Sequence, residues 1–442
     1  MNNNTFYALS TPPGFSAIST VRISGSKSLE TIKSLTKKNK DSFKSGKTVL
    51  CNIYIKNNKI LDRAVVVFYK KPRSYTGEDM VEINTHGNPI ITSQLFKKLS
   101  KLGLRLANPG EFTLTAFLNN KIDLVQAENV SALISARTKE GVSLALKNSL
   151  GKASNKFRGV RSSIINTLAL VEYELDNTDT TNLNTTLKQV KTEVEKTIKT
   201  IKNLLKHYSS TKTLIKGPRV VITGKPNVGK STIFNFILSR DRAIVASTPG
   251  TTRDIIDATC DIKDLHITLV DTAGTRKTDD LIEKIGVSKS KKETKSADLI
   301  LYVFDKKPEE IKTKNKALLV VNKIDEMSVG ELTNLKQSYK KNIFVSAKKG
   351  VGFSKLKKEI YSQLKTKKQT NQNMFIASER QKNILSSVFK LLKKSNKKLI
   401  SNELELVSYD LKAALNCFDD LLGKTTADDV LDVVFSGFCV GK

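Results

Sequence analysis

The sequence predicts a multidomain α/β protein, in which an N-terminal α+β domain precedes a helical domain that an inserted α/β domain interrupts. Mixed strand and helix patterns fill residues 1–120. Apolar residues at helical spacing cover 121–216 and return over 367–442. Between these segments, residues 217–366 alternate short apolar strands with helices, as βαβ units do. The helical domain is therefore expected to consist of two segments that lie far apart in the chain.

The N-terminal domain is expected to contain a hairpin and two helices. Residues 51–56 (CNIYIK) alternate apolar and polar side chains, and residues 62–69 (DRAVVVFY) form a largely apolar run. The Asn-Asn pair between these two strands favours a turn. Residues 28–35 and 88–99 place apolar side chains three and four positions apart, which predicts helices.

The segments on either side of the inserted domain are expected to form long amphipathic helices. Apolar residues recur at three- and four-residue steps at Leu124, Val130, Leu133, Ile134, Leu144, Leu150, Phe157, Val160, Ile164, Leu168 and Val171. After a polar stretch at 176–182, a second stripe contains Leu183, Leu187, Val190, Val194, Ile198, Ile201 and Leu205. Near the end of the chain, residues 425–429 (TTADD) predict a helix N-cap followed by acidic residues in the first turn.

The composition bounds the class of protein. The 442 residues carry a net charge of +32, which favours a nucleic-acid partner. Lysines are spread along the chain among many Asn and Ile residues, so compositional drift explains the charge equally well. No apolar run approaches the ~18 residues of a membrane span, and the N-terminus has no signal-peptide pattern. We expect a cytoplasmic protein without membrane contact. The cysteines are too dispersed for a zinc site or a disulfide framework: Cys51, Cys260, Cys417 and Cys439.

A phosphate-binding loop is predicted at the start of the inserted domain. Residues 224–231 (GKPNVGKS) follow an apolar strand, precede a helical pattern and match G-x-x-x-x-G-K-[ST]. The glycines allow backbone N–H groups to approach phosphate oxygens. Lys230 is expected to reach the β- and γ-phosphates, and Ser231 to bind Mg²⁺.

Two further motifs predict the groups around the γ-phosphate. Residues 271–274 (DTAG) follow an apolar strand, so Asp271 is expected to hold Mg²⁺ through water and the Gly274 N–H to sense the γ-phosphate. Residues 247–254 (STPGTTRD) lie between this motif and the phosphate-binding loop, where a switch loop belongs. Thr252 in that loop can close onto Mg²⁺.

The last two motifs predict a guanine site. Residues 322–325 (NKID) follow an apolar strand, and Asp325 can accept hydrogen bonds from both N1–H and N2–H of guanine. Residues 346–348 (SAK) are expected to close over the base. The five motifs, in order and each at a strand end, predict a P-loop GTPase domain. The GTP-binding residues expected from these motifs are Asn227, Val228, Gly229, Lys230, Ser231, Thr232, Ala246, Ser247, Thr248, Pro249, Gly250, Thr251, Thr252, Asp271, Thr272, Ala273, Gly274, Asn322, Lys323, Asp325, Ser346, Ala347 and Lys348.

The residue that orients the attacking water differs from Ras-like proteins. Thr275 follows the DTAG motif where those proteins have a glutamine. Another side chain must position the water, and Glu283 is a candidate. The alternative interpretation is that Glu283 is a solvated carboxylate on a helix face.

The sequences around the GTPase motifs resemble one particular family. The GKPNVGKS motif resembles translation-factor-like GTPases in general. Residues 8–25 (ALSTPPGFSAISTVRISG), 74–88 (SYTGEDMVEINTHGN), 107–128 (ANPGEFTLTAFLNNKIDLVQAE) and the final FCVGK resemble the tRNA modification GTPase MnmE family. The resemblance covers essentially the whole chain. Ribosome-assembly GTPases share the GTPase motifs but lack these flanking sequences.

This resemblance implies an N-terminal domain that binds tetrahydrofolate and mediates dimerisation, and a helical domain interrupted by a Ras-like P-loop GTPase domain. It further implies a K⁺-activated GTPase that forms a homodimer. With an FAD-dependent partner, in a heterotetramer, such a protein adds a carboxymethylaminomethyl-type group to C5 of the wobble uridine of certain tRNAs. The folate is 5-formyl- or methylene-tetrahydrofolate. A GTP-switched ribosome-assembly or RNA-binding factor remains the alternative function.

The resemblance also implies roles for individual residues. Asn227, the backbone carbonyls of Ala246 and Thr248, and Thr251 correspond to a K⁺ site, while Ser231 and Thr252 correspond to Mg²⁺ ligands. Glu283 corresponds to the catalytic glutamate, acting with Lys230 and Thr252. These correspondences make Glu283 the preferred residue for orienting the water.

The folate-binding positions implied by the resemblance are Arg22, Glu82, Lys121 and Lys442. Arginine and lysine can pair with the folate carboxylates, and a glutamate can accept hydrogen bonds from the pterin. The alternative for Arg22, Glu82 and Lys121 is that they form surface salt bridges. Cys439 corresponds to the family's terminal cysteine and is a candidate functional thiol, since a nearby ammonium can activate it. The alternative is that Cys439 is a small buried hydrophobic residue.

Overall fold

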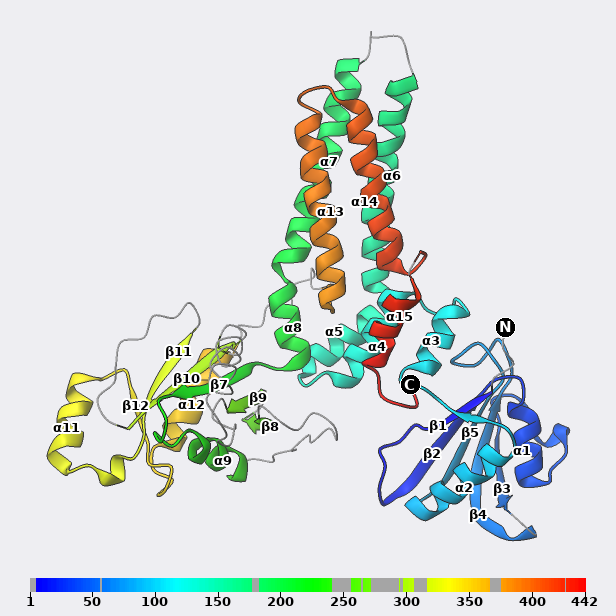
Figure 1. Cartoon of the computed structure of the whole chain (residues 1–442), viewed down its shortest axis with the longest axis horizontal. Helices are drawn as coiled ribbons and strands as arrows, with labels where there is room; N and C mark the ends of the chain where they lie inside the picture. The colour runs from blue at the N-terminus through cyan, green and yellow to red at the C-terminus, as the bar shows by residue number, and fades with distance from the viewer. Residues whose placement is uncertain are drawn as a thin grey trace, which may run out of the picture. The chain divides into compact units, whose positions relative to one another are not determined.

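The computed structural model describes residues 5–55, 58–176, 183–240, 256–263, 265–271, 294, 297–305, 316–365, 375–425 and 427–442. The chain divides into two compact units (Figure 1). The first unit consists of Met1–Ser131, Leu146–Leu205 and Ser378–Lys442. The second consists of Ala132–Ala145 and Lys206–Ala377. Helical segments from both sides of an α/β insertion thus share one unit, together with the N-terminal sheet, which confirms the predicted fold class.

A six-stranded sheet forms the N-terminal part of the first unit, with strand order β3-β4-β5-β2-β1-β6. Neighbouring strands are antiparallel except for the parallel pair β1–β6. The strands are β1 (Phe6–Leu9), β2 (Ser16–Ser24), β3 (Thr48–Tyr54), β4 (Ile60–Tyr69), β5 (Met80–Gly87) and β6 (Arg105–Leu106). The predicted hairpin is β3–β4, whose central residues pair Cys51 with Ala64.

Two helices pack their apolar faces against this sheet, as the sequence predicts. They are α1 (Ser28–Thr36) and α2 (Pro89–Lys101). Ile32 and Leu35 of α1 and Leu95 and Leu99 of α2 are fully buried in one cluster with Ile53 and other strand residues. The Asn88 side chain accepts a hydrogen bond from Ile90 N and begins α2, with proline at the first helical position.

Helices form the rest of the first unit, and α4, α5 and α7 also contribute residues to the second. The helices are α3 (Glu111–Leu118), α4 (Leu124–Ser135), α5 (Lys139–Ser149), α6 (Lys152–Asp176), α7 (Leu183–Lys206), α13 (Glu379–Lys398), α14 (Leu404–Leu422) and α15 (Asp428–Ser436). α14 packs on both α13 and α6 (Figure 1), and Arg161 of α6 pairs with Asp419 of α14 at 3.0 Å. The two chain segments therefore form one bundle. Of the polar stretch predicted between α6 and α7, residues 177–182 lie outside the described residues.

The helix α15 starts within the stretch where the sequence predicts a helix N-cap. Its N-cap residue is Ala427, which has no side-chain cap, and the helix begins at Asp428. The Thr425 hydroxyl instead donates to Asp420 Oδ1 at 2.9 Å. The helix start predicted within residues 425–429 is therefore confirmed in position, although no side-chain hydrogen bond caps it.

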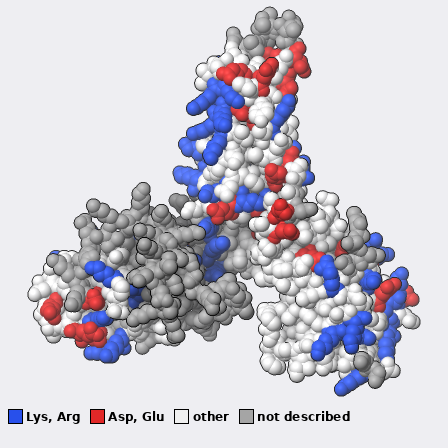
Figure 2. Space-filling view, viewed as in Figure 1, with Lys and Arg blue, Asp and Glu red and all other residues white. Residues whose placement is uncertain are grey.

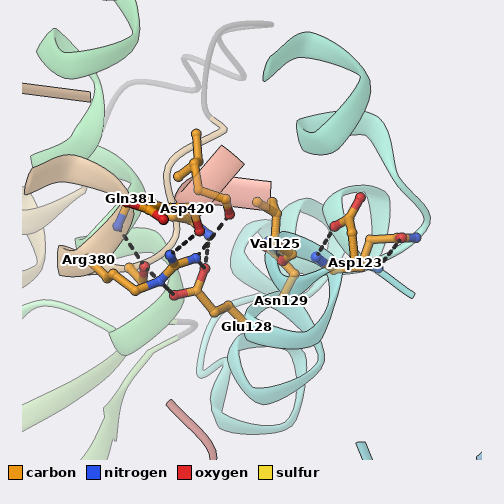
Figure 3. Close-up of polar contacts among 10 residues, drawn as sticks. Asp123, Val125, Glu128, Asn129, Arg380, Gln381 and Asp420 are labelled. Carbon is orange, nitrogen blue, oxygen red and sulfur yellow. Dashed lines mark hydrogen bonds and ion pairs between the residues drawn. The ribbon is translucent and has the colours of Figure 1, made fainter. Parts of the chain in front are cut away.

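A buried ionic cluster joins α4 to the second helical segment (Figure 3). Glu128 is 8% exposed and accepts hydrogen bonds from Ser378 Oγ at 2.9 Å and Arg380 Nε at 2.9 Å, as well as from Gln381. Arg380 also donates to the carbonyls of Asp420 and Leu421 at 3.0 and 3.1 Å. One carboxylate thus organises the start of α13 and the end of α14.

The beginning of α4 is anchored separately. Asp123 accepts a hydrogen bond from the Gln126 backbone N–H at 2.9 Å, and so caps the helix. The same carboxylate accepts from Ser154 Oγ at 2.8 Å and from Arg158 Nη2 at 2.6 Å, both on α6. The two acidic residues, Asp123 and Glu128, therefore fix α4 to both segments of the helical bundle.

The second unit contains a six-stranded sheet of order β12-β11-β10-β7-β9-β8. All neighbours are parallel except β8–β9. The strands are β7 (Arg219–Gly224), β8 (Ile256–Ile262), β9 (Leu265–Asp271), β10 (Leu299–Phe304), β11 (Ala317–Val321) and β12 (Ile343–Phe344). The helices include α8 (Tyr208–Lys216), α9 (Lys230–Arg240), α11 (Val329–Ser338) and α12 (Phe353–Leu364). The short apolar strands expected in this domain, residues 219–223, 266–270, 299–304 and 317–321, correspond to β7, β9, β10 and β11.

The central strands of this sheet are buried, which explains their continuous apolar sequences. Ile222, Leu269, Leu301 and Val320 are all fully buried. In a parallel sheet the carboxyl ends of the strands meet at one edge, where ligands bind.

Elsewhere in the molecule, no helix within the described ranges is both long and apolar enough to cross a membrane.

Candidate functional site

The phosphate-binding loop joins β7 to α9 in a conformation that requires glycine. Gly224 and Gly229 have φ of +146° and +90°. A Cβ at Gly224 would lie 2.3 Å from the Val303 carbonyl oxygen, and one at Gly229 would lie 2.3 Å from Asn322 Nδ2. Asn227, at φ 63°, also adopts the left-handed conformation and has an exposed side chain. The loop is therefore pressed against β10 and the residue after β11.

Lys230 folds back over this loop. Its Nζ donates to the backbone carbonyls of Gly224 at 3.1 Å and Lys225 at 2.7 Å. The residue is only 8% exposed, and its burial lowers the pKa of the ammonium, an effect that the Asp271 carboxylate opposes. The ammonium is thus held within the loop that would surround a phosphate group.

Ser231 and Asp271 come together from different elements. The first residue lies at the start of α9, and the second ends β9, a parallel neighbour of β7. Ser231 Oγ donates to Asp271 Oδ2 at 2.7 Å. Hydroxyl and carboxylate oxygens are the hard ligands that Mg²⁺ prefers. The pair therefore fits a magnesium ion that bound phosphates would complete. Among the described residues, no group of three or more His, Cys, Asp or Glu side chains could hold a metal ion.

Asn322 links the phosphate-binding loop to the predicted base-binding loop. The side chain is 2% exposed, and its Nδ2 donates to the Val228 carbonyl at 3.0 Å. Its Oδ1 accepts from the backbone N–H of Ala347 at 3.0 Å. Because both ends of the amide are used, one buried residue fixes two loops that are far apart in the sequence.

Asp325 lies in the turn beyond Asn322. A hydrogen bond from the Ser346 side chain lowers the pKa of its carboxyl, and the positive charges of Lys349 and Lys348 lower it further. The Ser346 hydroxyl also accepts from Lys349 N at 3.0 Å. The carboxylate is thus kept ionised beside the loop that is expected to cover guanine.

The remaining members of the predicted GTP site have simpler surroundings. Lys323 has φ 60° and forms an ion pair with Asp305 at 3.8 Å, while Thr232 and Lys348 are exposed. The other predicted site residues lie outside the described residues: Ala246, Ser247, Thr248, Pro249, Gly250, Thr251, Thr252, Thr272, Ala273, Gly274 and Glu283. Their places in the switch and potassium sites stay predictions.

A second cluster brings together three of the four predicted folate residues. Arg22 of β2 faces Glu82 of β5 across the sheet, and its Nε and Nη2 donate to Glu82 Oε1 at 2.9 and 2.6 Å. Arg22 Nη1 also donates to the Gly441 carbonyl at 3.3 Å. Burial lowers the pKa of the Lys442 ammonium, and the positive charge of Arg22 lowers it further. The charges of Glu82 and Cys439 act in the opposite direction and offset part of this decrease. Lys121 instead donates to the Pro72 carbonyl at 2.9 Å.

The C-terminal tail is held against β1 beside this cluster. Gly441 has φ +96°, and a Cβ there would lie 2.4 Å from the Leu9 carbonyl oxygen. Ser10 Oγ donates to the Gly441 carbonyl at 3.3 Å. The Cys439 carbonyl accepts from Gly110 N at 3.5 Å, while the Cys439 side chain is exposed rather than buried. The tail is therefore an ordered part of the cluster, and the interpretation of Cys439 as a buried hydrophobic residue is wrong.

Sequence reasoning missed two aromatic residues of this cluster. The Arg22 guanidinium lies 5.9 Å from the ring centre of Tyr75 and 5.6 Å from that of Phe112. Tyr75 also hydrogen-bonds to Thr113 at 2.9 Å. Both rings belong to stretches that carry the family resemblance, but an aromatic residue in a sequence suggests an ordinary core position. Only the fold places them beside an arginine.

A cavity of about 340 Å³ was also not anticipated from the sequence. It lies between the loop after β1 and helix α2, and its lining includes Leu9, Gly14, Ser19, Phe96 and Lys97. Because the cavity combines residues from three separate elements, no local sequence pattern could predict it.

Comparisons with known proteins identify the family of this chain. The MnmE helical domain family matches residues 124–439, and the family of the GTP-binding protein TrmE N-terminus matches residues 5–121. The tRNA modification GTPase MnmE of Fervidobacterium nodosum is 37% identical over 100% of this chain and 98% of its own length. That of Aquifex aeolicus is 40% identical over 98% of this chain and 99% of its own length.

One solved structure resembles part of the chain. A point variant of Aquifex aeolicus Era, bound to GDP and AlF₄⁻, is 25% identical and covers 39% of this chain and 66% of its own, with a TM-score of 0.26. A score that low supports no inference. The family matches and the full-length relatives are sufficient: the chain belongs to the MnmE family of tRNA modification GTPases.

Proposed function

We propose that this chain hydrolyses GTP and acts in tRNA modification. The observation that carries the proposal is the arrangement of Lys230, Ser231, Asp271 and Asn322 at the carboxyl edge of the inserted sheet. These residues supply a phosphate-binding ammonium, oxygen ligands for Mg²⁺ and a link to the base-binding loop. The full-length relatives named tRNA modification GTPases supply the context for this chemistry.

Within this proposal, each residue of the GTPase site has a distinct role. Lys230 neutralises charge on the β- and γ-phosphates, and Ser231 with Thr252 binds Mg²⁺. Asp325 selects guanine, and Glu283 orients the attacking water in place of the missing glutamine. Asn227, with Ala246, Thr248 and Thr251, would hold K⁺, which would supply positive charge where other GTPases use an arginine.

The finer chemistry concerns the tRNA. We infer that the chain acts as a homodimer, in a heterotetramer with an FAD-dependent partner, on C5 of the wobble uridine. The product carries a carboxymethylaminomethyl-type group, and the FAD resides on the partner. The N-terminal cluster binds the one-carbon folate, with Arg22 and Lys442 pairing with its carboxylates and Glu82 accepting from the pterin. Lys121, which lies outside the cluster, is the remaining residue proposed to pair with a folate carboxylate. The exposed Cys439 lies on the tail that completes this cluster.

Mass spectrometry of tRNA nucleosides tests this function. Unmodified tRNA is incubated with the protein, the FAD-dependent partner, GTP, a one-carbon folate and either KCl or NaCl. We expect a C5-modified wobble uridine that requires the protein, and faster GTP hydrolysis in KCl than in NaCl. Intact hydrolysis without any modified nucleoside would support the alternative, a GTP-switched RNA-binding factor. Equal hydrolysis rates in both salts would remove the potassium assignment alone.

Replacing Arg22 by alanine is expected to weaken binding of 5-formyl-tetrahydrofolate by about tenfold to a hundredfold, because a charge-assisted hydrogen bond is lost. Isothermal titration calorimetry measures the affinity. Arg63→Ala is the matched control, since Arg63 is an exposed arginine on β4 of the same sheet. Unchanged affinity in Arg22→Ala would show that the cluster does not bind folate.

A further inference from the structure

One side of the helical bundle is strongly basic. Helix α13 has seven basic residues and one acidic residue, and α7 has six lysines and two glutamates. Helix α14, which packs on α13, has one lysine and four acidic residues. Figure 2 shows Lys and Arg gathered along the side of the bundle where Figure 1 places α7 and α13, whereas Asp and Glu lie toward α14 and α6. Drift in composition would affect exposed faces of all these helices, so it does not explain this difference.

Three lysines form a continuous stripe on α13. Lys390, Lys394 and Lys397 are separated by four and three residues, so they lie on one face of the helix, and all three are exposed. Lysines at this spacing repel one another. Within the described part of the chain none of the three forms an ion pair, whereas the neighbouring Lys398 pairs with Asp410 at 2.8 Å. We call these three residues the lysine stripe.

Helix α7 presents lysines in the same way. Lys191, Lys199 and Lys202 are exposed, while Val194 and Ile201 are buried on the opposite face. Lys196 lies outside this row and pairs with Glu193 at 3.4 Å. The apolar residues of α7 account for its packing, so the outward lysines are not needed for the fold.

The chemistry of this side fits phosphate groups better than a protein partner. Protein interfaces have an apolar or aromatic centre and are depleted in lysine. The exposed residues in the two turns before the lysine stripe, Asn383 and Ser387, are polar. Lysine ammonium groups are compact charges that suit backbone phosphates.

We propose that the lysine stripe of α13, extended by the lysines of α7, binds the phosphate backbone of the tRNA substrate. This surface lies on helices of the first unit and is separate in sequence from the GTPase motifs. The inference rests on the proposed function for the identity of the RNA. It gives part of the +32 charge a location and a purpose.

Fluorescence anisotropy with a labelled unmodified tRNA transcript, measured over a range of KCl concentrations, tests the surface. The stripe variant combines Lys390→Gln, Lys394→Gln and Lys397→Gln, because glutamine preserves helix propensity. The matched control combines Lys336→Gln, Lys340→Gln and Lys341→Gln, which removes the same charge from exposed lysines of the second unit. A second variant with Lys191→Gln, Lys199→Gln and Lys202→Gln tests α7. GTP hydrolysis and the thermal unfolding midpoint should match wild type in every variant.

The stripe variant is expected to lose about tenfold or more in tRNA affinity at low salt. The slope of log affinity against log salt concentration should become shallower by about two to three, since each phosphate contact contributes about 0.7–0.9 to that slope. The control should change little. Equal losses in both triple variants would overturn the proposal, because the effect would then follow net charge rather than position.

The failure of this proposal and that of the proposed function can be distinguished, because tRNA binding by the protein alone needs neither GTP hydrolysis nor the FAD-dependent partner. If the stripe variant binds tRNA like wild type while the wild-type protein supports nucleoside modification, only the proposed surface is overturned. Suppose that the stripe variant binds tRNA more weakly than the control variant, and that the wild-type protein yields no modified nucleoside. This result would support the surface and count against the modification function.

Discussion

Replacing Lys230 by alanine is expected to slow GTP hydrolysis by about 10²–10³-fold, the usual cost of removing one preorganised group that stabilises transition-state charge. The ammonium is held within the phosphate-binding loop by the carbonyls of Gly224 and Lys225, at 3.1 and 2.7 Å. It is therefore positioned before any phosphate arrives. Release of inorganic phosphate at saturating GTP measures the rate.

The Lys230→Ala result needs a control for charge and one for folding. Lys355→Ala removes an exposed lysine from α12 of the same unit and should leave the rate unchanged. Thermal unfolding of Lys230→Ala should resemble that of wild type, because the hydrogen bonds of the ammonium go only to the loop. A hydrolysis rate within about threefold of wild type would contradict the assignment of Lys230.

Replacing Glu128 by alanine is expected to destabilise the first unit by about 3–5 kcal/mol, the typical cost of removing one partner from a buried ion pair. Arg380 would keep its hydrogen bonds to the carbonyls of Asp420 and Leu421, at 3.0 and 3.1 Å, but would lose its counter-ion. Its side chain is only 17% exposed, so water compensates poorly. Urea unfolding followed by far-ultraviolet circular dichroism measures the loss.

Two further variants separate the buried pair from the general effect of losing a carboxylate. Glu405→Ala, at an exposed position in the first turn of α14, should change stability by less than about 1 kcal/mol. Glu128→Gln should be less harmful than Glu128→Ala, because the amide oxygen can still accept from Ser378 or Arg380. If Glu128→Ala and Glu405→Ala have equal effects, the cluster does not hold the helical bundle together.

The GTPase motifs could be identified from the sequence because their chemistry depends on residues at fixed spacing. A phosphate-binding loop requires glycines where the backbone approaches phosphate, and Gly224 and Gly229 have the positive φ values that only glycine adopts readily. The strands that precede the motifs are apolar along their whole length because both faces of the sheet are covered. Local sequence was therefore sufficient to predict four of the six strands of this sheet.

The N-terminal cluster could not be predicted in the same way. Arg22 and Glu82 are paired by sheet register, and Gly441 joins them from the other end of the chain. The sequence suggested these positions only through a family resemblance, which gave no partners. Tyr75, Phe112 and the cavity between β1 and α2 had no signal at all, because aromatic and apolar residues also fill ordinary cores.

The sequence by itself determined the order of domains, four of the six strands of the inserted sheet and the composition of the phosphate-binding loop, because these features depend on neighbours in the chain. Only the tertiary structure decided that Glu128 joins α13 and α14, that Asn322 links two loops, and that the tail from Cys439 to Lys442 packs beside Arg22. These contacts join residues that are distant in sequence, and their energy depends on burial and direction, which no local pattern encodes.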